Sequence, residues 1–250
     1  MPKELKRVIK LSESKYFKGI ITIYRILKKL HAIEGVPEKK INILDCSVDL
    51  NEFDSVNYKK AELRKHLYLP LDKKILLYSG KLTDERGIDT YIEASRTLDN
   101  KKYEFCFLGG NKKEIKLWNK YIKKKRISGD FRFLGSKNYN LVKYYLKSAD
   151  LLLALFSSKC RTIKWMSPLK IFEYMASKVP FIASNAFRLH EICNNNECLF
   201  YNIDDSRDLS EKIKLLIENM DLRENLIQNA YTKVKNYGYK KRCEKILELI

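Results

Sequence analysis

Two stretches of the sequence carry cations in settings that suit the binding of a diphosphate. In the first, Lys81 and Arg86 lie five residues apart between an apolar run and a helical pattern. Gly80 and Gly87 permit tight turns there and a close approach of the backbone to a ligand. The two cations could clamp one diphosphate, Arg86 with a bidentate grip. Two solvated charges on a turn are the alternative, which this stretch alone favours.

The second stretch, residues 167–173, reads Ser-Pro-Leu-Lys-Ile-Phe-Glu. Ser167 suits a helix N-cap, and Pro168 suits the first helical position, where its missing N–H costs nothing. Free N–H groups and the positive end of the helix dipole would form an anion site, to which Lys170 adds a mobile charge. Glu173 could accept hydrogen bonds from sugar hydroxyls if it faces the same crevice. An ordinary capped helix is the alternative.

Strands that are apolar throughout alternate with helical patterns along the rest of the chain. The predicted strands are 19–24, 41–44, 74–80, 103–108, 131–134, 150–156, 180–184 and 198–201. Helices are predicted at 1–15, 24–33, 59–67, 88–98, up to 125, 141–147, from 167, 188–193, 207–219, 221–236 and 239–249, with a loop at 48–53. This order is typical of an α/β fold with a doubly wound, Rossmann-like parallel sheet.

Ligands of such sheets bind beyond the carboxyl ends of the strands. The loops 80–87, 109–110 and 156–167 are expected there. Gly109 and Gly110 would let a ligand approach closely, although glycines also commonly follow strands simply because the chain turns there.

Composition narrows the class of protein. The 250 residues are 45% hydrophobic, enough for a real core, and no apolar run approaches the length of a membrane span. The N-terminus lacks the apolar segment of a signal peptide. None of the six cysteines forms a Cys-x-x-Cys pair, and none of the three histidines has a metal-ligand spacing. We therefore predict a cytoplasmic protein without a metal site.

The net charge of +19 would suit nucleic acid, an anionic membrane surface or phosphorylated substrates. The lysines, however, are spread along the whole chain, and a lysine-rich coding style would give the same charge without a partner. No recognition-helix or base-stacking motif accompanies the charge, which disfavours nucleic-acid binding.

Taken together, the motifs are more specific than any one of them. In order, the segments 79–89, 107–110, 133–135, 149–153, 167–176, 180–184, 191–192 and 236–242 resemble the donor-binding half of glycosyltransferase family 4. The resemblance covers about residues 19–250. It implies the C-terminal half of a GT-B fold, in which two Rossmann-like domains flank a cleft. Residues 1–38 would be a remnant of a truncated N-terminal acceptor domain, and residues 39–250 the nucleotide-sugar-binding domain, with the last helix packing back toward the remnant.

The resemblance also implies roles for individual residues. Lys81 and Arg86 look like the pair that stabilises the diphosphate leaving group, in exchanged order relative to the family's usual arginine and lysine. Glu173 resembles the second glutamate of the Glu-x7-Glu motif, which binds the ribose hydroxyls; the first would fall at Trp165 and is missing. The other residues expected to bind the donor are Gly80, Gly109, Gly110, Ser167, Pro168, Leu169 and Lys170.

The implied activity is retaining transfer of a sugar from a nucleoside diphosphate sugar to an unknown acceptor, without a metal or cofactor. The apolar strand 19–24 would expose its faces and edges to solvent unless another sheet packs beside it, which suggests a separate acceptor-domain chain or a homo-oligomer as partner. Peripheral contact with the cytoplasmic face of an anionic membrane fits the charge. A non-catalytic nucleotide-sugar-binding module and, less favoured, a nucleic-acid-binding protein stay open as alternatives.

Overall fold

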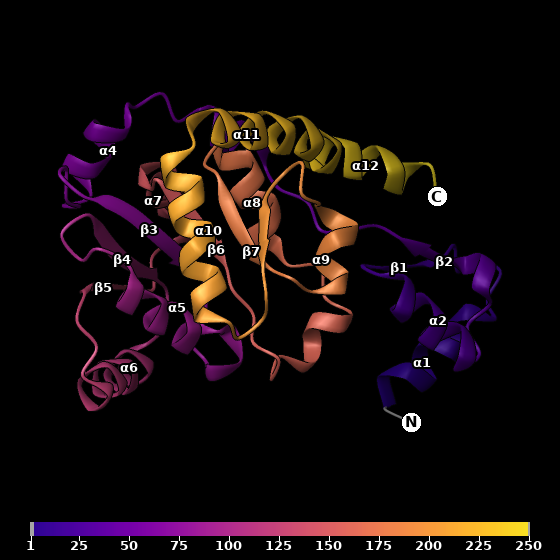
Figure 1. Ribbon diagram of the computed structural model, residues 1–250. Coiled ribbons are helices and arrows are strands. Elements are labelled where there is room, and N and C mark those ends of the chain that lie inside the picture. Colours follow the sequence, from indigo (N-terminus) through magenta and orange to yellow (C-terminus); the bar gives the residue numbers. More distant parts are fainter. Residues whose placement is uncertain (1–2, 250) are drawn as a thin grey trace.

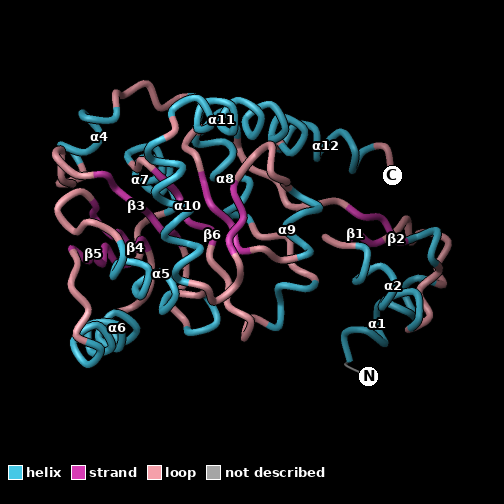
Figure 2. The backbone as a smooth tube through the Cα atoms, in the orientation of Figure 1, coloured by secondary structure: helices cyan, strands magenta, loops and turns pink. Residues whose placement is uncertain are grey.

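The computed structural model describes residues 3–249 and centres on a six-stranded sheet whose strands all run parallel (Figures 1 and 2). The strands lie in the order β5–β4–β3–β6–β7–β8. They are β3 (Lys74–Ser79), β4 (Tyr103–Leu108), β5 (Asp130–Gly135), β6 (Leu151–Ala154), β7 (Phe181–Ser184) and β8 (Leu199–Tyr201). The prediction of a doubly wound, Rossmann-like α/β fold is confirmed. The strand order reverses between β3 and β6, which makes their carboxyl ends the switch point.

Helices cover both faces of the sheet, which is why its central strands show no polar alternation. One face packs against α5 (Ile88–Ala94), α6 (Lys112–Lys125) and α10 (Ser206–Glu218). The other packs against α7 (Tyr139–Ser148), α8 (Leu169–Ser177), α9 (Phe187–Ile192) and α11 (Met220–Val234), and α4 (Lys60–His66) packs against α7. Short 3₁₀ turns occur at Glu38–Lys40, Asp84–Arg86, Ser95–Thr97, Arg161–Lys164 and Lys235–Tyr237.

The loop predicted at residues 48–53 is wrong, because a short helix, α3 (Leu50–Asp54), occupies most of it. The carboxylate of Asp49 accepts hydrogen bonds from the N–H groups of Asn51 (3.0 Å) and Glu52 (3.3 Å), so it caps the helix. Phe53 is buried in the core beside α8 and holds the helix in place.

A small N-terminal unit lies to one side of the main sheet (Figure 1). It consists of α1 (Lys3–Ser12), β1 (Ile20–Thr22), α2 (Arg25–Ile33) and β2 (Ile41–Ile43). Strands β1 and β2 pair in parallel as a separate two-stranded sheet. This sheet therefore extends past residue 38, where the sequence analysis placed a domain boundary. Helix α1 is shorter than the predicted helix 1–15, whose first two residues lie outside the described part.

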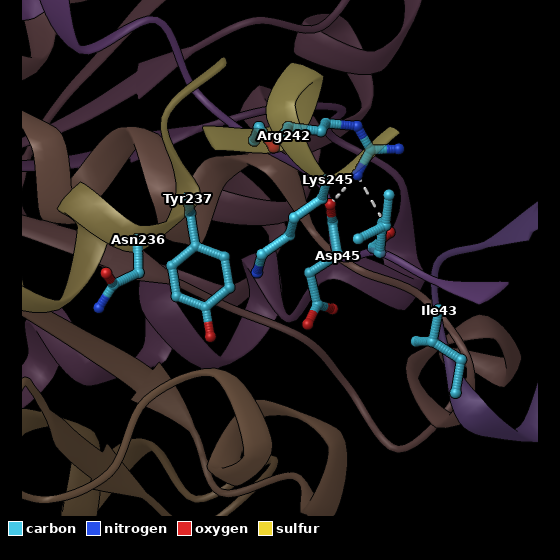
Figure 3. Close-up of a pocket in the computed structure, with 8 residues that line it drawn as sticks. Ile43, Asp45, Asn236, Tyr237, Arg242 and Lys245 are labelled. Carbon is cyan, nitrogen blue, oxygen red and sulfur yellow. Dashed lines mark hydrogen bonds between the residues drawn. The ribbon is translucent and has the colours of Figure 1, made fainter. Parts of the chain in front are cut away.

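The last helix, α12 (Tyr239–Leu247), continues from α11 and ends beside the segment that follows β2 (Figures 1 and 2). Nη1 of Arg242 donates to the carbonyl oxygens of Leu44 (3.1 Å) and Asp45. These groups border a cavity of about 200 Å³ between α12 and the segment after β2 (residues 44–49), which we call the linker (Figure 3). Its lining is Ile43, Leu44, Asp45, Ser47, Asn236, Tyr237, Arg242 and Lys245.

One buried guanidinium joins the small unit to the main domain. Arg188 of α9 is only 3% exposed, and its Nη2 donates to Ile23 O (3.3 Å) and to the Asp45 carboxylate. Its Nε donates to Met166 O (3.0 Å), and its Nη1 pairs with Glu191 (3.2 Å). The side chain of Arg188 thus links the residue after β1, the linker and the loop before α8.

Candidate functional site

A cavity of about 270 Å³ opens at the carboxyl ends of β3 and β6, where the strand order reverses. It is lined by Tyr78, Gly80, Lys81, Arg86, Phe156, Met166, Pro168, Leu169 and Lys170. Six of these are residues that the sequence analysis selected: Gly80, Lys81, Arg86, Pro168, Leu169 and Lys170. Four other hollows of the described surface, of about 200 to 620 Å³, contain no selected residue in their lining. We therefore take this cavity as the candidate site.

The loop after β3 carries the first two cations and is held by backbone contacts. Gly80 adopts a φ of +142°, which a side chain would strain, and its N–H donates to Leu108 O (2.9 Å). The hydroxyl of Tyr78 donates to Lys81 O (2.7 Å) and fixes the turn. The side chain of Lys81 is exposed at the rim of the cavity.

Gly109 and Gly110 lie beside this loop and not in the lining of the cavity. A Cβ atom at Gly109 would overlap the carbonyl oxygen of Gly80, and one at Gly110 would overlap Leu82. The two glycines therefore allow the loops after β3 and β4 to touch. Their expected close approach to a ligand stays a prediction.

Arg86 projects from the 3₁₀ turn at the end of the same loop and has only weak partners. Its guanidinium lies 5.5 Å from the ring centre of Phe156. Nη2 is 3.4 Å from the carboxylate of Glu85, and Nη1 is 4.0 Å from Sγ of Cys160. Most of its donors therefore keep the capacity to bind an anion.

Helix α8 begins one residue later than the sequence predicts. Pro168 is the N-cap and Leu169 the first helical residue, so the assignment of Ser167 as N-cap is wrong. The hydroxyl of Ser167 accepts from Cys46 N (3.1 Å) and donates to the carboxylate of Asp45 (3.2 Å) instead. It ties α8 to the linker, while no side chain among residues 3–249 caps the helix. The first N–H groups of α8 thus face the cavity at the positive end of the dipole.

Lys170, the second residue of α8, is not the mobile charge that the sequence suggests. Its Nζ is buried and has no hydrogen-bond partner among the described residues. It lies 4.2 Å from the ring centre of Tyr78 and 5.2 Å from that of Phe156. Burial, and then the charge of Arg86, lower the pKa of Lys170 to about 7. The ammonium is fixed against two aromatic rings inside the cavity.

Tyr174, one turn further along α8, lies outside the lining of the cavity and is buried behind it against β3 and β6. Its hydroxyl accepts from Ser79 N (3.1 Å) and donates to Leu153 O (3.2 Å). It therefore bridges the ends of β3 and β6, and its burial raises the pKa of the phenol. This contact fixes the position of the helix N-terminus relative to both strands.

Glu173 lies outside the lining of the cavity and is half-buried. Burial raises the pKa of its carboxyl group, against the opposing effects of Lys170 and Tyr139. Sequence reasoning missed three residues that do line the cavity, namely Tyr78, Phe156 and Met166. Two of them could have been found from their positions in the sequence, since Tyr78 and Phe156 lie at or just beyond the ends of strands flanking the switch point.

Comparison with known proteins identifies the family. A profile of the family described as glycosyl transferases group 1 matches residues 59–233. The chain is 26% identical over 174 residues to the putative teichuronic acid biosynthesis glycosyltransferase TuaC of Bacillus subtilis, covering 69% of this chain and 40% of that protein. It is 26% identical over 221 residues to a Campylobacter jejuni N,N'-diacetylbacillosaminyl-diphospho-undecaprenol alpha-1,3-N-acetylgalactosaminyltransferase, covering 86% of this chain and 55% of that protein.

Among solved structures, Anabaena Alr3699/HepE in complex with UDP and glucose superposes with a TM-score of 0.79 at 15% identity. The match covers 98% of this chain and 65% of that one, and it shows a shared fold. The chain spans about 40% to 55% of the length of the two curated relatives named above. Within residues 3–249, no helix combines the length and the apolar character that crossing a membrane requires.

Proposed function

The chain belongs to the glycosyl transferases group 1 family, and we propose that it moves a sugar from a nucleoside diphosphate sugar to an acceptor. The observation that carries the proposal is the cavity at the switch point. There Lys81, Arg86 and Lys170 converge on the open N-terminus of α8. Three cations and a helix N-terminus are suited to one diphosphate.

In the proposed reaction, the bond between the anomeric carbon and the diphosphate oxygen breaks, a bond to the acceptor oxygen forms, and the proton of the acceptor hydroxyl passes to the departing diphosphate. Negative charge develops on the departing diphosphate, where Arg86, Lys81 and the free N–H groups near Leu169 would stabilise it. The absence of a side chain at Gly80 would admit the phosphates, and Glu173 would accept hydrogen bonds from the ribose. We propose retention at the anomeric carbon and no metal in the reaction.

The donor and the acceptor are suggested by related proteins. The Anabaena structure contains UDP and glucose, so we propose a uridine nucleotide as the first donor to test. The Campylobacter relative is named for a diphospho-undecaprenol substrate. A lipid-linked acceptor, reached by docking on an anionic membrane surface, would also give the net charge of +19 a role.

We also propose that acceptor binding depends on a protein unit beyond these 250 residues, either a further domain, a separate chain or a second copy. The small sheet supports this, because Ile21 of β1 and Ile43 of β2 are 39% and 42% exposed. Two short strands alone are marginally stable in water, so an added sheet would stabilise them.

Calorimetric titration of UDP tests the donor site. We expect Arg86→Ala to weaken UDP binding about 10- to 100-fold, because a charge-assisted hydrogen bond is lost. Lys81→Ala should weaken it less, since Lys81 is exposed. Lys116→Ala removes the same charge from the exposed part of α6 and serves as the control. Equal affinity in all four proteins would contradict the assignment of this cavity.

A transfer assay separates the enzyme from a binding module. Trp165 stands where the family's first glutamate is expected, and this favours a second candidate, a nucleotide-sugar-binding protein without turnover. Release of UDP from UDP-glucose that depends on added membrane extract and disappears in Arg86→Ala would support the enzyme. Tight binding without release or transfer would support the module.

A further inference from the structure

Lys170 is the one selected cation whose charge the described part of the chain leaves both buried and unpaired. Its Nζ lines the cavity, touches the faces of Tyr78 and Phe156, and has no hydrogen-bond partner among residues 3–249. An ammonium in such a place loses its hydration without gaining an acceptor, which is costly. Either an arriving anion completes its coordination, or the group gives up its proton.

The neighbours of Lys170 do not supply the missing acceptor. Arg86, from the loop after β3, repels its charge, and Lys81 adds a second cation at the rim. Glu173 on α8 and Cys160 in the loop after β6 act in the opposite sense, but neither forms a hydrogen bond or ion pair with Nζ. With burial acting first, these groups hold the pKa of Lys170 at about 7, so about half of the side chains are neutral at pH 7.

We propose that Lys170 takes up a proton when a diphosphate enters the cavity, so that donor binding is coupled to protonation of this one side chain. The proposal rests on the proposed function and deepens it, because it assigns Lys170 a role distinct from that of Arg86 and Lys81. Those two cations attract the anion in the free protein. Lys170 becomes fully charged only when the anion is in place.

The proton balance is simple. In the free protein the neutral amine lies against the two rings at little cost. When the diphosphate binds, the amine takes one proton from the solvent, and the resulting ammonium donates hydrogen bonds to phosphate oxygens. Tyr78 and Phe156 favour the cation through their ring faces and shield it from water. When the diphosphate leaves, the proton returns to the solvent, so release becomes easier as pH rises.

Calorimetry in two buffers measures this proton directly. UDP is titrated into the full chain at pH 8 in HEPES and in Tris, whose ionisation enthalpies differ. The difference in observed enthalpy gives the number of protons taken up. We expect uptake of most of one proton per UDP at pH 8, since a group with a pKa of about 7 is then mostly neutral before binding.

Two variants separate a titrating role from a merely structural one. Lys170→Met should bind UDP more weakly, by about 10-fold or more, and take up no proton. Lys81→Met removes a neighbouring cation that is exposed and should weaken binding while leaving the proton uptake intact. GDP and ADP are titrated in parallel in case another base is required.

The outcomes are distinguishable. Uptake in wild type and in Lys81→Met, but not in Lys170→Met, supports the proposal. Binding of UDP by wild type with no uptake at pH 8, or uptake that persists in Lys170→Met, overturns it while the proposed function stands. Failure of UDP, GDP and ADP to bind at millimolar concentration overturns both. If Lys170→Met does not fold, the wild-type uptake at pH 8 decides alone.

Discussion

The two ends of the main sheet treat buried charge in opposite ways. At the amino end, the carboxylate of Asp150 accepts from Arg64 (2.5 Å), from Ile75 N (2.8 Å) and from Lys60 (3.2 Å). Arg64 also donates to the carbonyl oxygens of Lys73 and Ser148. At the carboxyl end, Lys170 is equally enclosed and has no such partner among the described residues. The protein completes one set of buried charges itself and, in our proposal, leaves the other for a diphosphate.

Helix direction explains why the two ends differ. The helices flanking a parallel sheet begin near its carboxyl end and finish near its amino end, so their dipoles favour anions at the former. Lys147 in the last turn of α7 and Lys178 at the C-cap of α8 accordingly lie at the amino end, where they complement the negative helix termini. Positive charge is structural there, whereas at the N-terminus of α8 it opposes the dipole unless an anion is bound.

The largest expected effect comes from removing the buried ion pair at the amino end of the sheet. Asp150→Ala should lower the free energy of unfolding by about 3–5 kcal/mol, because Arg64 would stay buried without its partner. Urea denaturation at pH 7 measures it. Asp130→Ala, which removes an exposed carboxylate paired with Lys73, is the control and should cost less than about 1 kcal/mol. Equal small losses in both variants would contradict the comparison.

The same ion pair predicts that the free energy of unfolding falls at acidic pH. Burial acts to raise the pKa of Asp150, but Lys60, Arg64 and the Ile75 amide outweigh it and hold the pKa below its ordinary value. The stabilisation is therefore present above about pH 4 and is lost as pH falls through the lowered pKa. Asp150→Ala should show a flatter stability profile in that range than wild type.

Removal of the unpaired charge at the carboxyl end of the sheet should change the free energy of unfolding in the opposite direction. Lys170→Met should raise the free energy of unfolding by about 1–4 kcal/mol at pH 6.5, because it removes a buried charge that lacks a partner. The pKa of Lys170 is lowered on folding, so the penalty is full below about pH 7 and vanishes above the ordinary lysine value. The gain should therefore shrink at pH 9.5. A destabilised variant at both pH values would show that the charge is compensated in the free protein.

The smallest expected effect concerns the hydroxyl of Tyr174, near the carboxyl end of the sheet. Tyr174→Phe should lower the free energy of unfolding by about 1 kcal/mol, since the hydroxyl joins Ser79 N to Leu153 O. It should also weaken UDP binding, because α8 loses its tie to the two strands. Tyr68→Phe, at a side chain that is 88% exposed, provides the control. Unchanged UDP affinity with reduced stability would mean that packing alone positions the helix.

The sequence was sufficient for the main sheet and for bringing six of the selected residues to one cavity. Contiguous apolar runs located β3, β4, β6 and β7, because strands buried on both faces show no polar alternation, and a glycine follows β3 and β4. The convergence of Arg86, Lys81 and Leu169 on one cavity followed from placing their loops at the same edge of the sheet.

What sequence reasoning missed depends on contacts across long separations. Ser167 has the chemistry of an N-cap, but its hydroxyl bonds the Asp45–Cys46 segment more than 120 residues away. The burial of Lys170 depends on Phe156 from another strand end, so it could not be inferred from its own helix. Helix α3 was a different failure, since Asp49 and Glu52 form a helix-start signal that the local sequence does contain.

The guanidinium of Arg188 has a consequence for motion. It bonds Ile23 O on the small unit and Met166 O, two residues before the N-cap of α8, so neither can shift independently without losing a buried hydrogen bond. A protein that docks on the small sheet and tilts it would therefore pull on the entrance of α8. Occupancy at that distant surface and the geometry before the N-terminus of α8 are therefore mechanically linked through Arg188.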